Sequence, residues 1–422
     1  MAAVGDRSPR LGRNGDVIRL FSTRAVRLFA YGALSVVLVL YLAEAGLSEA
    51  QIGLLLTLTL LGDTLISLWI TTHADRLGRR HMLAAGAALM LLAGCLFALS
   101  GEFVLLLAAA TVGVISPSGN EVGPFLPIEQ SALAQLLPDR RRTGVFAWYN
   151  LAGSFATALG ALSGGGLAGA LQGAGLEPLA SYRAVIGGYA VLGALLALVF
   201  LGVSPAVEAP THNPAQAVPA ASRGAFGLNE SRGIVLRLSA LFALDAFGGG
   251  FVVQSIVAFW FHRQFGVEPA LLGSIFFGAN ILAGVSALAA GWLARRIGLI
   301  RTMVFTHIPS NLLLMLVPLM PTLPLAVGVL LLRFSISQMD VPTRQSYTMA
   351  VVRPDERSAA AGITGVARTV GAGLAPVFSG LLMANPALLG APFLVAGAIK
   401  VGYDLLLYAS FQAVKPPEEA GA

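Results

Sequence analysis

The chain has 422 residues, of which 56% are hydrophobic and only 11% are charged. A soluble domain carries about 25% charged residues, so this composition excludes an ordinary soluble protein and predicts one that crosses a membrane many times. The net charge of +6 would suit a nucleic-acid partner, but its bases cluster in short segments between apolar stretches, so we expect no nucleic acid and interpret the charge as membrane topology.

The predicted membrane helices follow one another along almost the whole chain. Each apolar stretch is close to the roughly 20 residues that cross a bilayer as a helix. We expect twelve helices, at about 25–44, 52–70, 81–100, 103–138, 143–171, 184–203, 236–261, 269–293, 299–320, 323–351, 358–383 and 391–411. The first is not followed by a cleavage site, so it is expected to be an uncleaved start-transfer helix.

Polar segments divide the chain into lobes, a linker and tails. The predicted parts are a cytoplasmic tail at 1–23, a six-helix lobe at 24–204, a cytoplasmic linker at 205–232, a second six-helix lobe at 233–412 and a cytoplasmic tail at 413–422. Most of the 27 Lys and Arg fall in the tails, the linker and the loops on one side. The positive-inside rule therefore predicts a multi-pass protein of the cell (inner) membrane with both termini cytoplasmic.

The two lobes repeat one another at an offset of 220 residues. This offset superimposes Gly46 on Gly266, Gly53 on Gly273, and Gly78 on Gly298. One register that carries three landmarks indicates a duplicated six-helix unit.

A charged turn between the second and third predicted helices carries a family resemblance. Asp75-Arg76-Leu77-Gly78-Arg79-Arg80 resembles the loop between helices 2 and 3 of the major facilitator superfamily, with Thr71 in place of the family's leading Gly. The resemblance implies an all-α polytopic membrane protein with twelve transmembrane helices in two pseudo-twofold six-helix bundles. It also implies alternating access around a cavity lined by helices 1, 4, 7 and 10. Gating is assigned by the same resemblance to Asp75, Arg76, Gly78 and Arg79.

The fourth predicted helix is too long to be one span. Phe103 to Pro138 is 36 residues, or roughly 54 Å of helix against a hydrocarbon core of about 30 Å. Its middle, 116–124, is rich in Ser, Gly and Pro, which a continuous helix disfavours. We favour a broken helix that lines the cavity, and the alternative is an outer loop with a helix that starts near Phe125.

Charged residues inside the predicted helices are the main candidates for a site. There are ten of them, counting the helix 4 interruption: Asp63, Glu121, Glu129, Asp245, Arg333, Asp340, Arg344, Arg368, Lys400 and Asp404. Each charge at mid-helix costs about 2.5–3.5 kcal/mol on insertion scales, so each needs a partner or water. The first half supplies three acids and no base, and the second supplies three acids and four bases. Pairs across the two halves are therefore expected.

Spacing suggests roles for several of these residues. On helix 10, Arg333, Ser337, Asp340 and Arg344 form one polar stripe, with steps of 4, 3 and 4. On helix 12, the i, i+4 spacing of Lys400 and Asp404 predicts a structural pair. We assign substrate binding or proton coupling to Asn120, Glu121, Asp245, Arg333, Asp340 and Arg368.

A duplicated segment predicts a gate. Glu129 and Arg344 occupy the same place in Pro-x-[charge]-Gln-Ser, at an offset of 215 rather than 220, so five extra residues precede Glu129. We predict that Glu129 and Arg344 pair between the lobes. In the alternative, each is satisfied within its own lobe, Arg344 by Asp340.

These features predict a monomeric secondary transporter without cofactor or metal that moves a small organic molecule. Proton-coupled efflux is favoured because acids in a dry site can take up a proton and because 160–165 is similar to the superfamily's antiporter motif. The aromatics suited to an amphipathic substrate are Tyr31, Trp148, Tyr149, Phe251 and Trp260. The alternatives are uptake of an organic anion held by Arg333, Arg344 and Arg368, and a non-transporting sensor or scaffold. An enzyme is not expected, because all five His are placed in tails, loops or loop edges.

Overall fold

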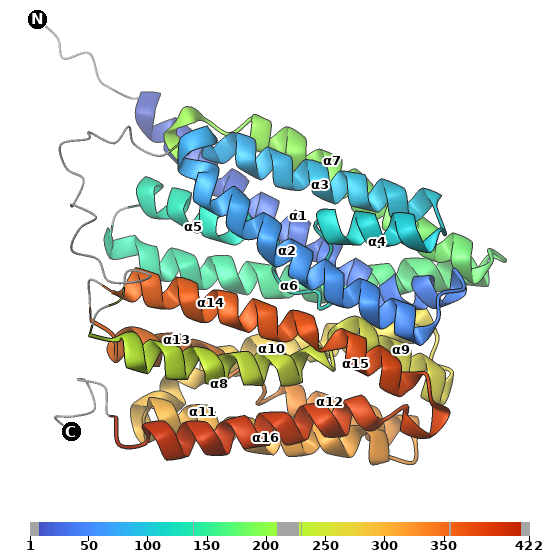
Figure 1. The fold of residues 1–422 in the computed structure, drawn as a ribbon. Helices are drawn as coiled ribbons and strands as arrows, with labels where there is room; N and C mark the ends of the chain where they lie inside the picture. The colour runs from blue at the N-terminus through green and yellow to red at the C-terminus, as the bar shows by residue number, and fades with distance from the viewer. Residues whose placement is uncertain (1–7, 138, 209–227, 229, 354–355, 415–422) are drawn as a thin grey trace, which may run out of the picture.

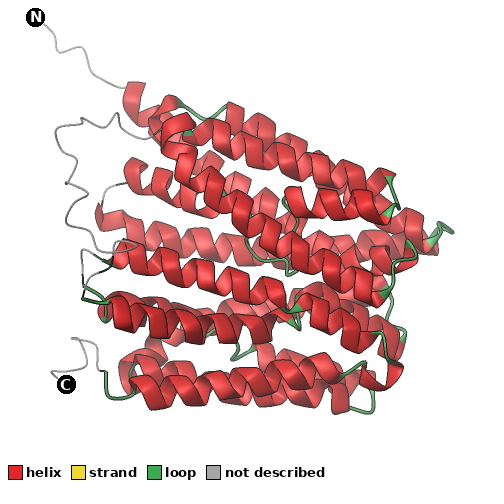
Figure 2. Cartoon of the chain, in the orientation of Figure 1, coloured by secondary structure: helices red, strands yellow, loops and turns green. Residues whose placement is uncertain are grey.

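The structure, a computed structural model, describes residues 8–137, 139–208, 228, 230–353 and 356–414. The described residues form helices joined by short loops, and none of them is in a strand (Figure 2). Ten helical spans are long and apolar enough to cross a membrane, and shorter apolar helices at Phe103–Val112 and Leu323–Phe334 belong to two further, interrupted spans. The predicted all-α polytopic fold is confirmed.

The helices fall into two halves that lie one above the other in Figure 1. The first half comprises α1 (Ser8–Glu44), α2 (Glu49–Leu77), α3 (Arg79–Leu99), α4 (Phe103–Val112), α5 (Phe125–Leu136), α6 (Asp139–Gly173) and α7 (Pro178–Leu201). The second comprises α8 (Arg232–Gly250), α9 (Gln254–Phe265), α10 (Pro269–Ile297), α11 (Leu299–Leu316), α12 (Leu323–Phe334), α13 (Asp340–Ala350), α14 (Arg357–Leu374), α15 (Pro376–Met383) and α16 (Ala391–Phe411).

The first helix defines the two ends of the bundle. It starts at Ser8 rather than near residue 25, so most of the predicted N-terminal tail is helical. We name the ends of the bundle the Ser8 end and the Glu44 end after the limits of α1. The corner between α2 and α3 at the Ser8 end is formed by Gly78 (φ 96°), and its repeat partner Gly298 (φ 86°) forms the corner between α10 and α11. A positive φ is accessible to glycine at little cost, which explains why the repeat keeps it.

The break predicted in helix 4 is present, since α4 ends at Val112 and α5 begins at Phe125. Three more spans, predicted as continuous, are also interrupted: α8–α9, α12–α13 and α14–α15. The run Gly248-Gly249-Gly250 precedes the first of these interruptions, and glycine has a poor helix propensity. Pro376 follows the third interruption, and proline lacks the backbone N–H donor. In the second, the N–H of Gln338 donates to Ser286 Oγ of α10 (3.2 Å) instead of to its own helix.

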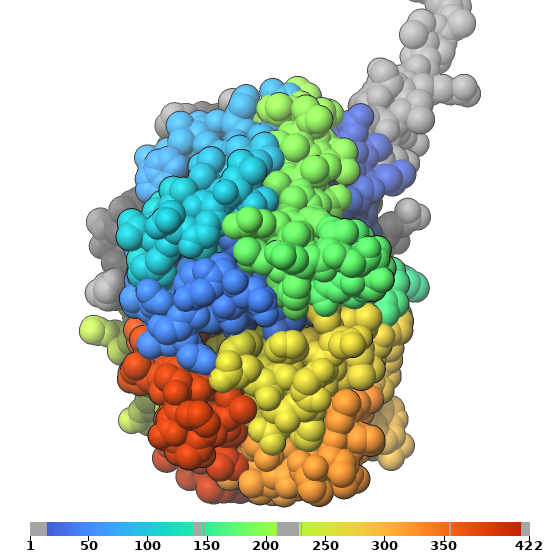
Figure 3. All heavy atoms as spheres, turned by 90° about the vertical axis from the view of Figure 1, so that its right-hand side faces the viewer, coloured from blue at the N-terminus to red at the C-terminus, as the bar shows by residue number. Residues whose placement is uncertain are grey.

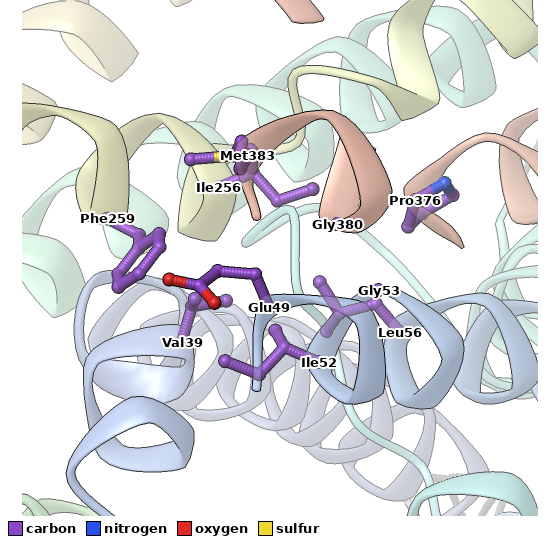
Figure 4. A pocket seen from close by; sticks show the side chains of 10 residues that line it. All are labelled: Val39, Glu49, Ile52, Gly53, Leu56, Ile256, Phe259, Pro376, Gly380 and Met383. Atoms are coloured by element: carbon purple, nitrogen blue, oxygen red, sulfur yellow. The ribbon is translucent and has the colours of Figure 1, made fainter. Parts of the chain in front are cut away.

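The halves touch backbone to backbone through two glycine pairs. A Cβ added to Gly53 of α2 would lie 3.0 Å from Gly380 Cα of α15, and one added to Gly165 of α6 would lie 2.8 Å from Gly273 Cα of α10. Figure 4 views the first seam, with Pro376, Gly380 and Met383 facing Glu49, Ile52, Gly53 and Leu56 around a small apolar pocket. Gly53 and Gly273 are partners at the 220-residue offset, so the duplicated fold makes the same contact twice.

Polar contacts between the halves are confined to the half of the bundle nearest the Glu44 end. Gln254 Nε2 donates to Ser35 Oγ (2.7 Å), and the N–H of Val377 donates to Thr57 Oγ1 (2.9 Å). Figure 3, which faces this end, shows first-half segments resting on second-half segments. Among the described residues, no hydrogen bond or ion pair joins the halves at the Ser8 end. The protein is therefore closed at the Glu44 end.

Enlarging Gly165 should open this closed end. In Gly165→Leu the new Cβ would lie 2.3 Å from the backbone oxygen of Pro269, which cannot move aside without separating α6 from α10. Spin labels at Leu176 and Leu388, on loops of opposite halves, should report a longer distance by pulsed electron paramagnetic resonance in a Cys95→Ser background.

The matched control for this prediction is the neighbouring glycine. Gly166→Leu should leave the distance unchanged, because no atom lies within 4 Å of a Cβ at that position. Equal distances in the two variants would contradict the assignment of Gly165 to the closure.

Candidate functional site

Four charges of the first half form one buried network at the break in helix 4. Arg27 of α1 donates to both carboxylate oxygens of Glu129 on α5, at 3.0 and 2.7 Å, and neither side chain is exposed. The same guanidinium donates to Glu121 (2.8 Å), which also accepts from Arg24 (2.8 Å). Tyr149 of α6 donates a short hydrogen bond to Glu129. Two guanidinium and two carboxylate groups thus neutralise one another inside one half.

The backbone of the break is satisfied by side chains from the surrounding helices. Tyr31 of α1 donates to the carbonyl of Val122 (3.3 Å), and Tyr189 of α7 donates to the carbonyl of Val114. Thr157 of α6 donates to Gly119 O (3.3 Å). Irregular backbone is tolerated at membrane depth only where protein or water satisfies it in this way. These contacts favour the broken-helix interpretation over a displaced outer loop.

Two glycines and one predicted site residue lie in the same segment. Gly119 (φ 70°) and Gly123 (φ 82°) adopt the left-handed region, which explains their place in the break. Asn120 is exposed, and its side chain makes no hydrogen bond with the described residues. Of the predicted pair, the break therefore brings Glu121 into the charge network but not Asn120.

A second network lies in the second half, around Asp245 of α8. Lys400 Nζ of α16 lies 2.5 Å from one of its carboxylate oxygens, and Arg344 Nη1 of α13 lies 3.4 Å from the other. Arg344 also donates to Asp340 at 2.6 Å. The helix 10 stripe placed Asp340 near Arg344, and the structure adds Asp245 of α8, a separate candidate, to this pair.

The structural pair predicted between Lys400 and Asp404 is wrong. Asp404 instead meets His307 Nδ1 (2.8 Å) and accepts from Asn311 Nδ2 (3.2 Å), both on α11. His307 was assigned to a loop edge, but it is buried in the middle of α11. The i, i+4 spacing allowed a contact between Lys400 and Asp404, and closer partners on neighbouring helices replaced it.

The predicted gate between Glu129 and Arg344 is also not formed, because each residue pairs within its own half. Glu129 is bound by Arg27, and Arg344 is bound to Asp340 and Asp245. The alternative interpretation, in which each lobe satisfies its own charges, matches the structure. In both halves the duplicated segment contacts the first helix of its own bundle, with the charges reversed.

The count of first-half charges was wrong because it contained no base. Arg27 lies within the predicted span 25–44, and Arg24 lies at its edge, but neither was counted among the membrane charges. The signal that could have found them was present: Glu121 and Glu129 lacked any partner in their own half. A buried charge without a partner is costly enough that it predicts one nearby.

Two cations at membrane depth in the second half have no acidic partner among the described residues. Arg333, at the end of α12, and Arg368, in the middle of α14, lie within 4 Å of no carboxylate among the described residues. The Nε atom of each is buried without a hydrogen bond. The strongest charges acting on Arg368 are those of Arg344, Asp245 and Asp340, so it borders the network without closing an ion pair.

The charged turn between α2 and α3 lies at the Ser8 end, away from both networks. Arg79 Nε donates to Asp75 (2.8 Å), and Arg79 Nη1 donates to Gln135 of α5 (3.0 Å). Glu208 accepts from the backbone N–H of Arg79 (2.6 Å) and so caps α3. Asp75 and Arg76 are exposed. The turn lies at the Ser8 end, where no hydrogen bond or ion pair joins the halves within the described part of the chain, and its gating role stays a prediction from the motif.

Most of the aromatic residues proposed to contact an amphipathic substrate are part of the packed core. Tyr31, Tyr149 and Trp260 are at most 1% exposed, and Phe251 is 4% exposed. Trp148 is 67% exposed. Among the described residues, no group of three or more His, Cys, Asp or Glu side chains is arranged to hold a metal ion.

A pair of double-mutant cycles should separate the observed pairing from the predicted gate. The free energy of unfolding, measured by detergent titration, should show a coupling of about 1–3 kcal/mol between Arg27→Gln and Glu129→Gln, because the two groups share one buried pair. The effects of Glu129→Gln and Arg344→Gln should add within about 0.5 kcal/mol, because they share no partner. A coupling in the second cycle as large as in the first would restore the gate.

Comparisons with known proteins agree with this arrangement. Residues 20–376 match the family model described as Major Facilitator Superfamily. Uncharacterized membrane protein YJR124C of Saccharomyces cerevisiae is 31% identical over 94% of each chain, and quinolone resistance protein NorA of Staphylococcus aureus is 24% identical over 32% of this chain and 34% of its own. The structure of a bacterial homologue of the human lysosomal transporter Spinster, inward-facing and unoccupied, has a TM-score of 0.72 at 19% identity and covers 96% of both chains. The chain belongs to the major facilitator superfamily, a family of secondary transporters and not of enzymes.

Proposed function

We propose that this secondary transporter carries a small organic anion, driven by protons, and that Arg368 is its anion contact. The observation that carries the proposal is a partly buried arginine whose Nε is buried without a hydrogen bond and which has no carboxylate partner among the described residues. Every other base at this depth, apart from Arg333, is within 4 Å of an acid. Arg368 is therefore a cation available to a ligand. In this superfamily the substrates bind at this depth, between the halves.

Arg368 lies on α14, a helix that contacts both halves of the protein. It shares one face of α14 with Thr364 and Gly371, and Gly371 packs against Ala243 of α8. The same helix also crosses to the first half, since a Cβ on Gly373 would lie 3.0 Å from Leu61 of α2. The helix that carries Arg368 therefore contacts both halves, α8 on the face of Arg368 and α2 on another face.

The chemistry of a guanidinium decides the class of ligand. An unpaired charge at mid-helix costs about 2.5–3.5 kcal/mol on insertion scales, and an anionic ligand would offset part of that cost. The planar donor pair of arginine matches a carboxylate or phosphate with two parallel hydrogen bonds. Arg333, which lies over the ring of Phe334 at 4.9 Å, is a second cation available to the same ligand class. These features support an anion over a neutral or cationic solute.

The orientation in the membrane, the oligomeric state and the driving ion complete the proposal. The basic loops and tails support a cytoplasmic Ser8 end in the cell membrane, so the closed Glu44 end would face outward, as in an inward-facing state. We propose that the protein acts as a monomer in lipid and that protons drive the transport. Export of an amphipathic solute is the second candidate, and the similarity to NorA over a third of the chain favours it. The burial of Tyr31, Tyr149 and Trp260 counts against this second candidate.

Thermal stabilisation should distinguish the two substrate classes. Purified protein should be stabilised by members of a panel of organic carboxylates and phosphates, and not by neutral or cationic dyes. Arg368→Gln should lose at least ~90% of the affinity for the stabilising anion, because removing one charge-assisted hydrogen-bond donor pair costs about 1.5–3 kcal/mol.

Arg301→Gln is the matched control, because this substitution removes the same charge from a residue that is exposed at the Ser8 end. Its affinity for the anion should be unchanged. Stabilisation by cationic dyes alone, or equal losses in the two variants, would reject the anion assignment and favour the second candidate.

A further inference from the structure

One buried acid differs from every other acid at membrane depth. Asp63, in the middle of α2, is 9% exposed, and no Lys, Arg or His among the described residues lies within 4 Å of it. Its carboxylate accepts from Ser67 Oγ at 3.4 Å, and the backbone N–H of Gly123 lies against it. The other acids at this depth are all paired with a base: Glu121, Glu129, Asp245, Asp340 and Asp404.

We propose that Asp63 is the group that carries the coupling proton, an inference that rests on the proton coupling of the proposed function. A carboxylate paired with a guanidinium keeps its charge at low cost, whereas an unpaired one at this depth does not. The unpaired carboxylate of Asp63 is therefore the proposed proton carrier, in place of the paired acids that the sequence suggested, Glu121, Asp245 and Asp340. The step is a simple exchange: water on one side of the membrane gives a proton to the carboxylate, and water on the other side takes it back.

Asp63 lies where the structure can respond to its charge. The preceding residue, Gly62, packs directly on α4, since a Cβ there would lie 2.0 Å from Thr111 O, one residue before α4 ends. The charged and titratable groups that act on Asp63 are Glu121 of the break, Tyr31 of α1 and Tyr189 of α7. The helix α4 has no titratable residue, and among the described residues no ion pair joins Arg368 of α14 to Asp63.

Two routes connect Asp63 to the closed Glu44 end. Through Gly123 it acts on the break, and the carbonyl of Pro117 in that break accepts from the N–H of Ser255 in the other half (3.1 Å). Asp63 also shares α2 with Thr57, whose hydroxyl accepts from the N–H of Val377 across the seam (2.9 Å). The ionised carboxylate of Asp63 attracts the neighbouring Gly123 N–H, and protonation weakens this attraction and adds a hydroxyl donor. Protonation thus changes the contacts that hold the break against the second half.

The test measures the closed end directly and needs no substrate. Spin labels at Leu176 and Leu388, in a Cys95→Ser background in lipid nanodiscs, report the opening of the Glu44 end between pH 5.5 and pH 8.5. In the parent protein the open fraction should change at least ~3-fold over this range. In Asp63→Asn it should become independent of pH, and in Asp63→Glu it should change again with a shifted midpoint.

Ser67→Ala is the control, because it removes a neighbour of the carboxylate and leaves the titrating group. It should retain the pH response. If Asp63→Asn does not fold, the infrared carbonyl band of the protonated acid in the parent protein and in Asp63→Glu decides the matter: the titrating band should shift between the two. An unchanged pH response in Asp63→Asn, an unshifted band in Asp63→Glu, or no response in the parent protein would overturn the proposal.

The outcome is separable from that of the proposed function. A pH response that depends on Asp63 together with no stabilisation by organic anions would reject the substrate class and keep the proton site. Anion binding that depends on Arg368 with a pH response that survives in Asp63→Asn would do the reverse.

Discussion

Charge neutralisation inside each half is the constraint on which the rest of the structure depends. The lipid core makes an unpaired charge costly, and in alternating access the halves move against one another. A pair that bridged them would be broken in every cycle. The protein avoids this cost by closing its pairs locally, Arg27 with Glu129 in one half and Asp245 with Arg344 in the other. The ion pair that does cross between the halves, Arg263 with Glu49 (3.6 Å), is partly exposed and lies outside these buried networks.

The duplication produces this local pairing in both halves with opposite signs. The segment Pro-x-[charge]-Gln-Ser carries Glu129 in the first copy and Arg344 in the second, and the first helix of each bundle carries the complementary charge. Contact between the halves is made mainly by glycine, hydroxyl and backbone groups, as at Gly53–Gly380 and Gly165–Gly273, with the partly exposed pair Arg263–Glu49 at the Glu44 end. The glycine, hydroxyl and backbone contacts are short and specific, and they can separate without leaving a charge behind.

Among the described residues at membrane depth, one acid in the first half and two bases in the second have no ionic partner. Asp63 lies beside the break of helix 4, and Arg368 lies beside the Asp245 network, on α14, which packs against α2 of the first half. The proposed proton site and the proposed anion site are thus on helices that touch across the seam. A change at either one reaches the same interface, which is the physical requirement for coupling two binding events.

The sequence by itself determined the features that local chemistry controls. Composition specified a membrane protein, the glycine register specified the duplication, and the Ser/Gly/Pro stretch at 116–124 specified the break in helix 4. These follow from apolar length, backbone freedom and the missing donor of proline, which need no knowledge of neighbouring helices. The charged turn with Gly78 gave the family for the same reason, since a positive φ at a helix corner restricts the residue.

Only the tertiary structure decided which charge meets which. Spacing allowed Lys400 to meet Asp404, and repeat symmetry allowed Glu129 to meet Arg344, yet Asp245 and Arg27 took these partners from neighbouring helices. Arg24 lies just before the predicted span 25–44, whereas Arg27 and His307 lie within the predicted spans 25–44 and 299–320 but were not counted among the membrane charges. Pairing between helices depends on how each helix is rotated about its axis, and that rotation is set by the packing of the whole bundle. The same packing leaves Asp63 and Arg368 without an ionic partner.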